Sequence, residues 1–263
     1  MREFSDIKWL TAANLKWIAV VTMLVDHISA SLLEWYVDCT PSGASDALAF
    51  LVSQAMRCIG RLSFPLFIFL LVEGFFHTRS RARYLGRLSA FALISELPFD
   101  LARVNWRSSL DSGAWIRWDA QNVFFTLAIG FATIWAFEVL RKRAQGRGAA
   151  GKAVAACGGI ALAVGGCLLA TIVCCDYGWA GVLAIVVAYL LRPLGRPWFE
   201  MAAILVPLSI WSLRELFALP AILIALLYNG EKGKGPGKWF FYMFYPGHLL
   251  ALGITKVLLV FPR

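Results

Sequence analysis

Long apolar runs separated by short polar segments dominate this sequence. Nine runs are candidate membrane spans, at about residues 15–36, 48–76, 84–102, 122–140, 153–174, 178–191, 198–213, 216–229 and 239–260. A helix that crosses a bilayer needs about 20 mostly apolar residues, so the three runs between 178 and 229 are short enough to be tilted, broken or miscounted. The pattern predicts an all-α, polytopic membrane bundle of about nine transmembrane helices, with residues 1–263 forming a single transmembrane domain.

Composition supports the membrane class and excludes an ordinary soluble domain. Hydrophobic residues make up 60% of the chain and charged residues only 16%, whereas soluble domains carry about 25% charged residues. The net charge of +9 lies in short loops between the apolar runs. Such loops orient membrane helices, so the positive charge predicts no nucleic-acid partner. The six cysteines lack metal-site spacing, and we expect no metal.

The distribution of basic residues predicts the orientation in the cell membrane. Three loops, 77–87, 141–152 and 230–238, are rich in Lys and Arg, whereas the 37–47 loop contains neither. Placing the basic loops in the cytoplasm puts the N-terminus inside and the C-terminus outside. The Trp-rich 103–121 loop carries mixed charge and is the exception, which we expect to be a structured external segment.

Three further features concern processing, loops and cysteines. The first apolar run is too long for a signal-peptide core and lacks a small-residue cleavage pattern, so we expect it to be retained as a helix. The Gly-rich segments 143–151 and 229–237 lack P-loop spacing and are interpreted as flexible cytoplasmic loops. At the predicted external ends, Cys39 could form a disulfide with Cys174 or Cys175 if that side is oxidising.

An ionisable pair, Asp26 and His27, interrupts the first apolar run near its middle. Charge at that depth is costly unless partners or water compensate it, so such residues are functional by default. Lys16 stands eleven residues before His27, on nearly the same helix face and about 16 Å along the axis. Adjacent side chains on a helix diverge by about 100°, so we expect Glu96, Asp100 or a tyrosine, rather than Asp26, to orient the imidazole.

Two arginines, Arg57 and Arg61, share one face of the second apolar run. Arginines at this depth cannot face lipid, and two interpretations stay open. Either they pair with carboxylates and hold the bundle together, the candidates being Asp26, Glu96 and Asp100, or they hold an anionic or carbonyl-bearing substrate.

Two prolines mark expected irregularities beside polar residues. Pro98 should kink the third helix next to Glu96, which is a candidate charge partner or proton relay. Pro246 and Gly247 should break the last helix just before His248. His248 is then either a catalytic residue re-aimed by the break or a satisfied core histidine.

Other polar residues can be explained without a catalytic role. Asn122 and Thr126 could form hydrogen bonds at the external mouth or serve interhelical packing. Arg214 and Glu215 are expected to pair with each other at a membrane edge, and His77 to be a solvated interfacial residue.

Several motifs together resemble a known family. In order along the chain these are LKWIAVVTMLVDHIS, MRCIGRLSFPLFIFLLVEGFFHTRS, ALISELPFDLA, NVFFTLAIG and FYMFYPGHLL. They resemble the TraX-type membrane acetyltransferases, whose namesake acetylates the N-terminus of conjugative pilin, and the likeness runs from about residue 14 to 255. The spacing Lys16-x10-His27 is also similar to the Arg-x10-His motif of acyltransferase-3 type enzymes. Lys replaces Arg here, so that role carries over as charge rather than as a bidentate fork.

The resemblance implies transfer of an acetyl group from cytoplasmic acetyl-CoA, as co-substrate, to an amine or hydroxyl acceptor. A histidine suits this chemistry as general base or as nucleophile. The candidate catalytic residues are His27, Asp26, Glu96 and His248. The candidate contacts for acetyl-CoA are Lys16, Arg57, Arg61, Arg79 and Arg81, and those for the acceptor are Asp100, Asn122 and Tyr245. The external mouth near Asn122, Trp115 and Trp118 should admit the acceptor.

Alternatives stay open for the identity of the acceptor and for the class of function. A protein N-terminus, an amino sugar, a polysaccharide hydroxyl or a small amine would each serve as acceptor. The alternative function is a proton-coupled transporter or flippase using intramembrane His, Glu and Arg, although no inverted repeat with paired broken helices is evident. A third interpretation is a membrane assembly factor whose buried charges serve packing alone.

The orientation is the first testable prediction. Single cysteines placed in the 37–47 loop should react with a membrane-impermeant maleimide added outside intact cells, because that loop lacks basic residues. Cysteines in the 230–238 loop should react only after permeabilisation. Protection of the 37–47 loop in intact cells would contradict the predicted orientation.

Overall fold

The computed structural model describes residues 8–39, 44–103 and 118–260, and throughout these residues every regular element is a helix. Contacts group the chain into two compact units. The first unit comprises Met1–Phe67, Leu93–Arg117 and Arg214–Arg263, and the second comprises Ile68–Ala92 and Trp118–Leu213. The all-α class expected from the apolar pattern is confirmed over the described residues.

The helices follow the apolar runs closely. In chain order they are α1 (Ala12–Ile28), a π-helical turn (Ser29–Leu33), α2 (Glu34–Cys39), α3 (Ala44–Gly60), α4 (Ser63–His77), α5 (Arg81–Arg103), α7 (Val123–Ala144), α8 (Gly148–Ile172), α9 (Gly178–Leu191), α10 (Pro197–Trp211), a 3-10 segment (Leu213–Ala218), α11 (Pro220–Leu226) and α12 (Lys238–Val260).

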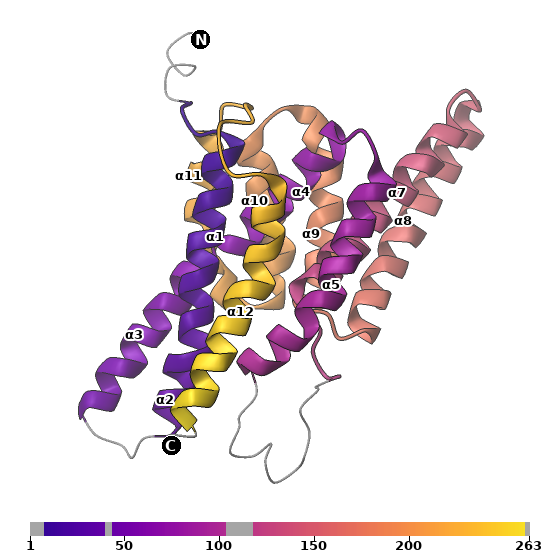
Figure 1. The fold of residues 1–263 in the computed structure, drawn as a ribbon. Helices are drawn as coiled ribbons and strands as arrows, with labels where there is room; N and C mark the ends of the chain where they lie inside the picture. Colours follow the sequence, from indigo (N-terminus) through magenta and orange to yellow (C-terminus); the bar gives the residue numbers. More distant parts are fainter. Residues whose placement is uncertain (1–7, 40–43, 104–117, 261–263) are drawn as a thin grey trace. The chain divides into compact units, whose positions relative to one another are not determined.

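The first unit is built around α1, which packs against α3 and α12 (Figure 1). Thr11 caps α1 through a capping box with Asn14, in which the side chain of each residue bonds the backbone of the other. The backbone N–H groups of Ala12 and Ala13 donate to the carbonyls of Glu231 and Lys232, at 2.8 and 3.0 Å. The 229–237 segment, expected to be a flexible loop, is therefore anchored on the N-terminus of α1.

The π-helical turn changes the phase of the first helix. Figure 1 shows α1 continuing through this turn into α2. Over eight residues an α-helix advances by about 800°, which would leave Glu34 about 80° away from the face of Asp26. One extra residue in a π turn reduces the advance to about 700°, within about 20° of the same face. The turn thus brings two carboxylates onto the side of α1 that faces α3.

The second apolar run forms two helices rather than the one expected over residues 48–76. α3 ends at Gly60, a turn occupies Arg61 and Leu62, and α4 begins at Ser63. Pro65 explains the interruption, because proline has no N–H to donate to the carbonyl of Arg61 and its ring would clash with that carbonyl. Proline is tolerated in the first turn of a helix, which is where Pro65 lies in α4.

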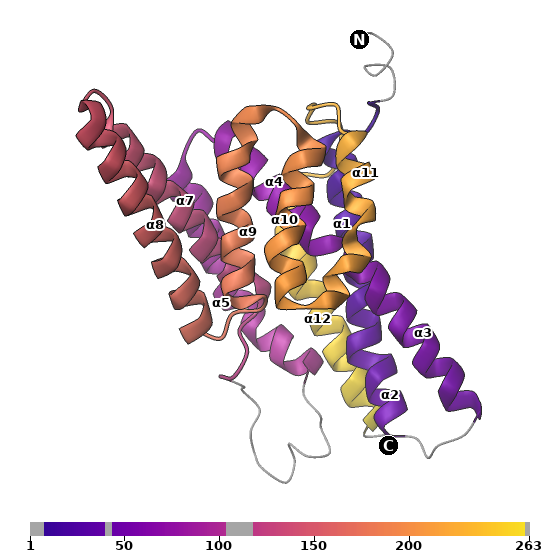
Figure 2. The ribbon, with the colours of Figure 1, turned by 180° about the vertical axis from the view of Figure 1, so that it is seen from behind.

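The second unit contains four packed helices, α7 to α10, shown in Figure 2. α8 presents small residues to α7, and Gly159 and Gly166 lie seven residues apart on this buried face. A Cβ on Gly159 would meet the ring of Phe137, and one on Gly166 would meet the side chain of Thr133. Small residues let helix backbones approach closely where lipid provides no hydrophobic driving force.

The expected count of about nine membrane spans is not confirmed. Within the described ranges, four segments are long and apolar enough to cross a membrane, namely Ala12–Val37, Ala47–His77, Val123–Ala144 and Gly148–Ile172. Two shorter apolar helices cover Gly178–Leu194 and Pro197–Trp211. The run expected at 216–229 is instead a 3-10 segment followed by the seven-residue α11. A helix of that length spans about 10 Å, whereas the hydrocarbon core of a bilayer is about 30 Å thick.

The predicted disulfide stays a prediction. Cys174 is exposed and Cys175 is buried, and the Cys39 side chain lies outside the described residues.

Glycine packing between α7 and α8 can be tested with two matched substitutions. Gly159→Ala should lower the stability of the purified protein by about 1–3 kcal/mol, because its Cβ would overlap a packed ring. In Gly165→Ala, on the same helix, nothing lies within 4 Å of the new Cβ, so thermal unfolding should be unchanged or slightly raised by the better helix propensity of alanine. Equal unfolding temperatures for the two variants would contradict this packing.

Candidate active site

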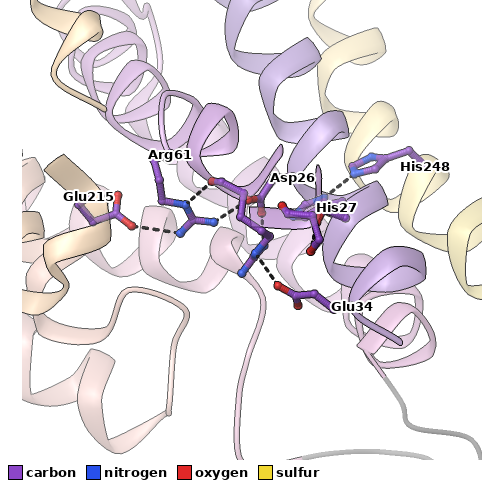
Figure 3. Close-up of polar contacts among 9 residues, drawn as sticks. Asp26, His27, Glu34, Arg61, Glu215 and His248 are labelled. Atoms are coloured by element: carbon purple, nitrogen blue, oxygen red, sulfur yellow. Dashed lines mark hydrogen bonds and ion pairs between the residues drawn. The ribbon is translucent and has the colours of Figure 1, made fainter. Parts of the chain in front are cut away.

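Two histidines from distant parts of the chain meet in the first unit. His27 lies in the last turn of α1 and His248 lies in α12. His27 Nδ1 is 2.6 Å from His248 Nε2, and the two rings are nearly coplanar, with 8° between their planes and 5.0 Å between centroids. This separation is close to two ring radii plus one hydrogen bond, so the rings meet edge to edge (Figure 3). The pair is an in-plane imidazole–imidazole hydrogen bond.

A backbone carbonyl fixes the direction of this hydrogen bond. His248 Nδ1 lies 2.6 Å from the carbonyl oxygen of Phe244. A carbonyl can only accept, so His248 Nδ1 carries a proton, and in the neutral ring Nε2 is then the acceptor. His27 Nδ1 must therefore be the donor. Among the described residues, His27 Nε2 is the one imidazole nitrogen of the pair without a hydrogen-bond partner, and in this tautomer it holds a free lone pair.

The α12 helix presents His248 without the break expected at Pro246 and Gly247. It is continuous from Lys238 to Val260, with Pro246 in its interior. The orientation of the His248 ring is instead set by its hydrogen bond to the preceding turn of α12 and by ring contacts. Phe244 stacks on His248 with centroids 4.9 Å apart, and Tyr245 meets His27 edge-on at 5.8 Å.

The group that orients His27 also differs from expectation. We expected Glu96, Asp100 or a tyrosine, whereas the hydrogen-bond partner is His248 and Tyr245 contributes a ring contact. Glu96 and Asp100 lie on α5, half-buried and buried respectively.

The carboxylate of Asp26 is clamped by two guanidinium groups from α3 and the turn that follows it. Arg57 Nη1 is 2.6 Å from Asp26 Oδ2, and Arg61 Nη2 is 2.7 Å from Asp26 Oδ1. Each oxygen thus receives its own charge-assisted hydrogen bond, and such bonds are about twice as strong as neutral ones. Of the two interpretations of the arginines, pairing with a carboxylate is what the structure shows.

Two further carboxylates extend this cluster into a chain of alternating charges. Arg57 Nε lies 3.2 Å from Glu34 Oε1, and Arg61 Nη1 lies 3.0 Å from Glu215 Oε1 (Figure 3). Glu215 is only 1% exposed. We expected it to pair with Arg214 at a membrane edge, but it pairs with Arg61. Three carboxylates face two guanidinium groups, which leaves one negative charge in excess. We call these five residues the ion chain.

The close approach of α3 to α1 depends on a glycine. A Cβ on Gly60 would lie 2.3 Å from both the Cβ and the Oδ1 of Asp26. No side chain fits between the two helices at this level, and glycine lets the guanidinium groups reach Asp26. Sequence reasoning did not identify Gly60, although it stands directly before Arg61 in the motif MRCIGRLSF.

Lys16 lies on α1 below His27, as the spacing predicted, and is half-buried. Its ammonium group lies over the face of Phe241 of α12, 5.5 Å from the ring centroid. This contact is a cation–π interaction.

Three residues assigned to substrates from sequence lie in the second unit. Asn122 is fully buried, accepts from the backbone N–H of Phe124 as the N-cap of α7, and donates to the carbonyl of Ala92 at 2.7 Å. Helix capping therefore explains Asn122 better than contact with an acceptor. Arg79 is exposed, and the guanidinium of Arg81 lies 4.3 Å from the ring centroid of Phe75. Trp115 lies outside the described residues.

The second unit contains a buried ion cluster that the sequence analysis missed. Arg192 pairs with Glu73 and approaches Glu200 Oε2 at 3.5 Å, and Glu200 is fully buried. His77 bonds its own helix at Glu73 and is 69% exposed. No sequence signal joined these residues, because Glu73 and Glu200 are 127 positions apart.

The fold and this site define a class: a helical integral membrane protein with a partly buried histidine pair beside a partly buried ion chain. A family model described as TraX protein matches residues 11–256, so the chain belongs to the TraX family. The resemblance to that family is confirmed, whereas the similarity to acyltransferase-3 type enzymes stays a prediction. A relative named "Probable fimbrial assembly protein FimC, serogroup H1", from Dichelobacter nodosus, is 30% identical over 273 residues, covering 95% of this chain and 97% of the relative. No solved structure gives a significant match.

The ion chain predicts unequal costs for two carboxylates. Asp26→Asn should destabilise the protein by about 3–5 kcal/mol, because it removes the shared partner of two partly buried cations. Glu34→Gln should cost about 1 kcal/mol or less, because the Glu34 side chain is 37% exposed. Thermal unfolding in one detergent measures both, and equal losses would show that Asp26 is not the centre of the chain.

Proposed function

We propose that this protein is a membrane acetyltransferase that moves an acetyl group from cytoplasmic acetyl-CoA to an amine or hydroxyl acceptor, with His27 as the general base. The observation that carries the proposal is the 2.6 Å hydrogen bond from His27 Nδ1 to His248 Nε2. It leaves the other nitrogen of His27 able to take a proton. Membership of the TraX family supports the reaction class.

The proposed reaction needs one proton acceptor. The acceptor nitrogen or oxygen attacks the thioester carbonyl carbon while His27 Nε2 removes the proton that this nucleophile loses. A new C–N or C–O bond forms and the C–S bond breaks, so that CoA leaves as a thiolate. The imidazolium of His27 then returns its proton to that sulfur. The products are the acetylated acceptor and CoA, and His27 regains its starting state.

His248 is the positioning residue in this scheme. Its Nδ1–H is committed to the Phe244 carbonyl, and its Nε2 accepts from His27. It holds the proton of His27 on Nδ1 and the lone pair on Nε2. If His248 is removed, His27 remains, but its tautomer and ring orientation are no longer fixed.

The ion chain lies directly beside the proposed base. Asp26 precedes His27 in sequence, and Arg57 and Arg61 hold its carboxylate. The ion chain therefore anchors the turn of α1 that carries His27. Arg57 and Arg61 are assigned to this chain rather than to direct contact with acetyl-CoA.

A direct transfer is favoured over a covalent intermediate. A nucleophilic His27 would carry an acetyl-imidazole and release CoA before the acceptor binds. Such an intermediate hydrolyses wherever water reaches the site. A general base instead requires both substrates together, so CoA should not be released when the acceptor is absent.

We propose an N-terminal amine of a pilin-like subunit as the acceptor. The family's namesake acetylates such an amine, and the relative from Dichelobacter nodosus is named as a fimbrial assembly protein. A synthetic peptide carrying the N-terminus of a pilin from the same cell should be acetylated, and the same peptide with a blocked N-terminus should not be.

The three histidines of the chain provide a matched test of the base. With purified protein, labelled acetyl-CoA and an amine acceptor, His27→Ala should lower kcat by at least about a hundredfold, the usual scale for losing an acid–base group. His248→Ala should cause a smaller loss, because the base itself remains. His77→Ala should leave kcat unchanged, because this exposed residue contacts only its own helix among the described contacts.

Other results of these assays would support other assignments. Loss of turnover in His248→Ala, with most activity kept in His27→Ala, would place the base on α12. CoA release without acceptor would favour the covalent route. Absence of any acetyl transfer, together with proton-driven solute uptake by reconstituted vesicles, would replace the enzyme by the transporter alternative.

A further inference from the structure

Three lysines lie close to the start of α1, and the charges of two of them, Lys16 and Lys232, act on each other. Lys16 lies one turn inside α1, and Lys232 and Lys234 lie on the segment anchored at its N-terminus. The carbonyl of Lys232 accepts from the backbone N–H of Ala13, three residues before Lys16. Lys232 is thereby held beside Lys16. We call these three lysines the basic cluster.

The anchoring of this segment is specific. Gly233 has a φ of +69° and lies so close to Thr11 that a Cβ would meet its side-chain oxygen at 2.1 Å. A β-carbon at Gly235 would lie 3.2 Å from the Cβ of Ala13. Both glycines therefore let the backbone lie on the first turn of α1, and this fixes the lysines that alternate with them. A loose loop would not need either feature.

The part of the chain that the structure describes places no acidic partner on the basic cluster. Among the described residues, no carboxylate pairs with Lys16, Lys232 or Lys234. Lys16 instead meets the face of Phe241. The nearest acid in the segment is Glu231, whose Oε2 accepts from the side-chain amide of Asn229 and whose backbone N–H donates to Asn229 Oδ1. Ammonium groups held together without an acid repel one another, and an anion with several negative oxygens would relieve that repulsion.

We propose that the basic cluster binds phosphate groups, and that in the working enzyme these are the phosphates at the nucleotide end of the acyl donor. This inference rests on the proposed acetyl transfer, and it moves the phosphate contacts from Arg79 and Arg81 to the start of α1. Lys16 lies about 16 Å along α1 from His27. The phosphates of acetyl-CoA are joined to its thioester by the long pantetheine arm, so a donor held at the cluster has its reactive end toward the histidine pair.

The arginines of the ion chain do not compete for this role. Arg57 and Arg61 are each bound by two carboxylates, whereas the lysines of the basic cluster have none among the described contacts. The phosphate headgroup of an anionic lipid has the same chemistry as the nucleotide end. The test must therefore separate the two sources.

The probe is adenosine 3′,5′-bisphosphate, which carries nucleotide phosphates without the pantetheine arm or thioester. Its binding to the full-length protein in nanodiscs of phosphatidylcholine is measured by calorimetry. The double variant Lys232→Gln/Lys234→Gln should weaken binding by at least about tenfold. A matched control, Arg147→Gln/Lys152→Gln, removes the same charge from exposed residues near the start of α8 and should bind as the wild type does.

Turnover gives an independent measurement. The lysine double variant should raise KM for acetyl-CoA by a similar factor and leave kcat nearly unchanged, because the histidine pair is intact. Lysine-dependent binding of the probe without any acetyl transfer would overturn the proposed function and leave the phosphate site standing. Acetyl transfer with unchanged KM and unchanged probe binding in the lysine variant would overturn the site alone.

A lipid arm completes the test. If the wild type fails to bind the probe, but phosphatidylglycerol raises its unfolding temperature and does not raise that of the lysine variant, the phosphate belongs to a lipid headgroup. That outcome would overturn the assignment to the acyl donor. Failure of both ligands would overturn the phosphate site.

Discussion

The first unit depends on compensation of one carboxylate at membrane depth. An ionised Asp26 away from water is tolerated only when partners satisfy both oxygens, and Arg57 and Arg61 supply one charged donor to each. This requirement brings α3 against α1 at Gly60, where a side chain would overlap Asp26. It also gives a reason for the π turn, which rotates Glu34 onto the same side and completes the coordination of Arg57. A costly charge, once buried, constrains the backbone around it.

A carboxylate from the last third of the chain also takes part in this charge compensation. Glu215 lies in a 3-10 segment far from Arg61 in sequence, yet it is the second carboxylate of that guanidinium. α12 approaches α1 from another side and brings His248 to His27. Asp26 and His27, adjacent in sequence, therefore serve different partners, since neighbouring side chains on a helix point in different directions. Asp26 pairs with the arginines of α3 and the turn after it, and His27 pairs with His248 of α12.

The second unit shows a different way to stabilise helices in lipid. Glycines of α8 admit aromatic and threonine side chains of α7, so close packing replaces the hydrophobic driving force that lipid does not provide. One cluster of its ionisable groups is local to this unit, with Arg192 between Glu73 and Glu200. Neither arrangement requires the histidine pair, which fits a division between a unit that carries the candidate chemistry and one that is mainly packing.

The sequence by itself determined the all-α class and most of the helix positions, and it singled out Asp26, His27, Arg57, Arg61 and His248 as candidates. Apolar runs report burial in lipid directly, and an ionisable residue inside such a run is conspicuous without any structure. Short-range steric rules could also have located the end of α3, because Pro65 cannot donate to the carbonyl of Arg61. The tertiary structure alone decided which charges meet. One partner of Arg61, Glu215, and the partner of His27, His248, are each more than 150 positions away in the sequence. Periodicity within one helix gives the direction of a side chain but not the identity of the helix it faces. The tautomer of His27 could likewise be deduced only from the structure, because it depends on the hydrogen bond from His248 to the Phe244 carbonyl in α12.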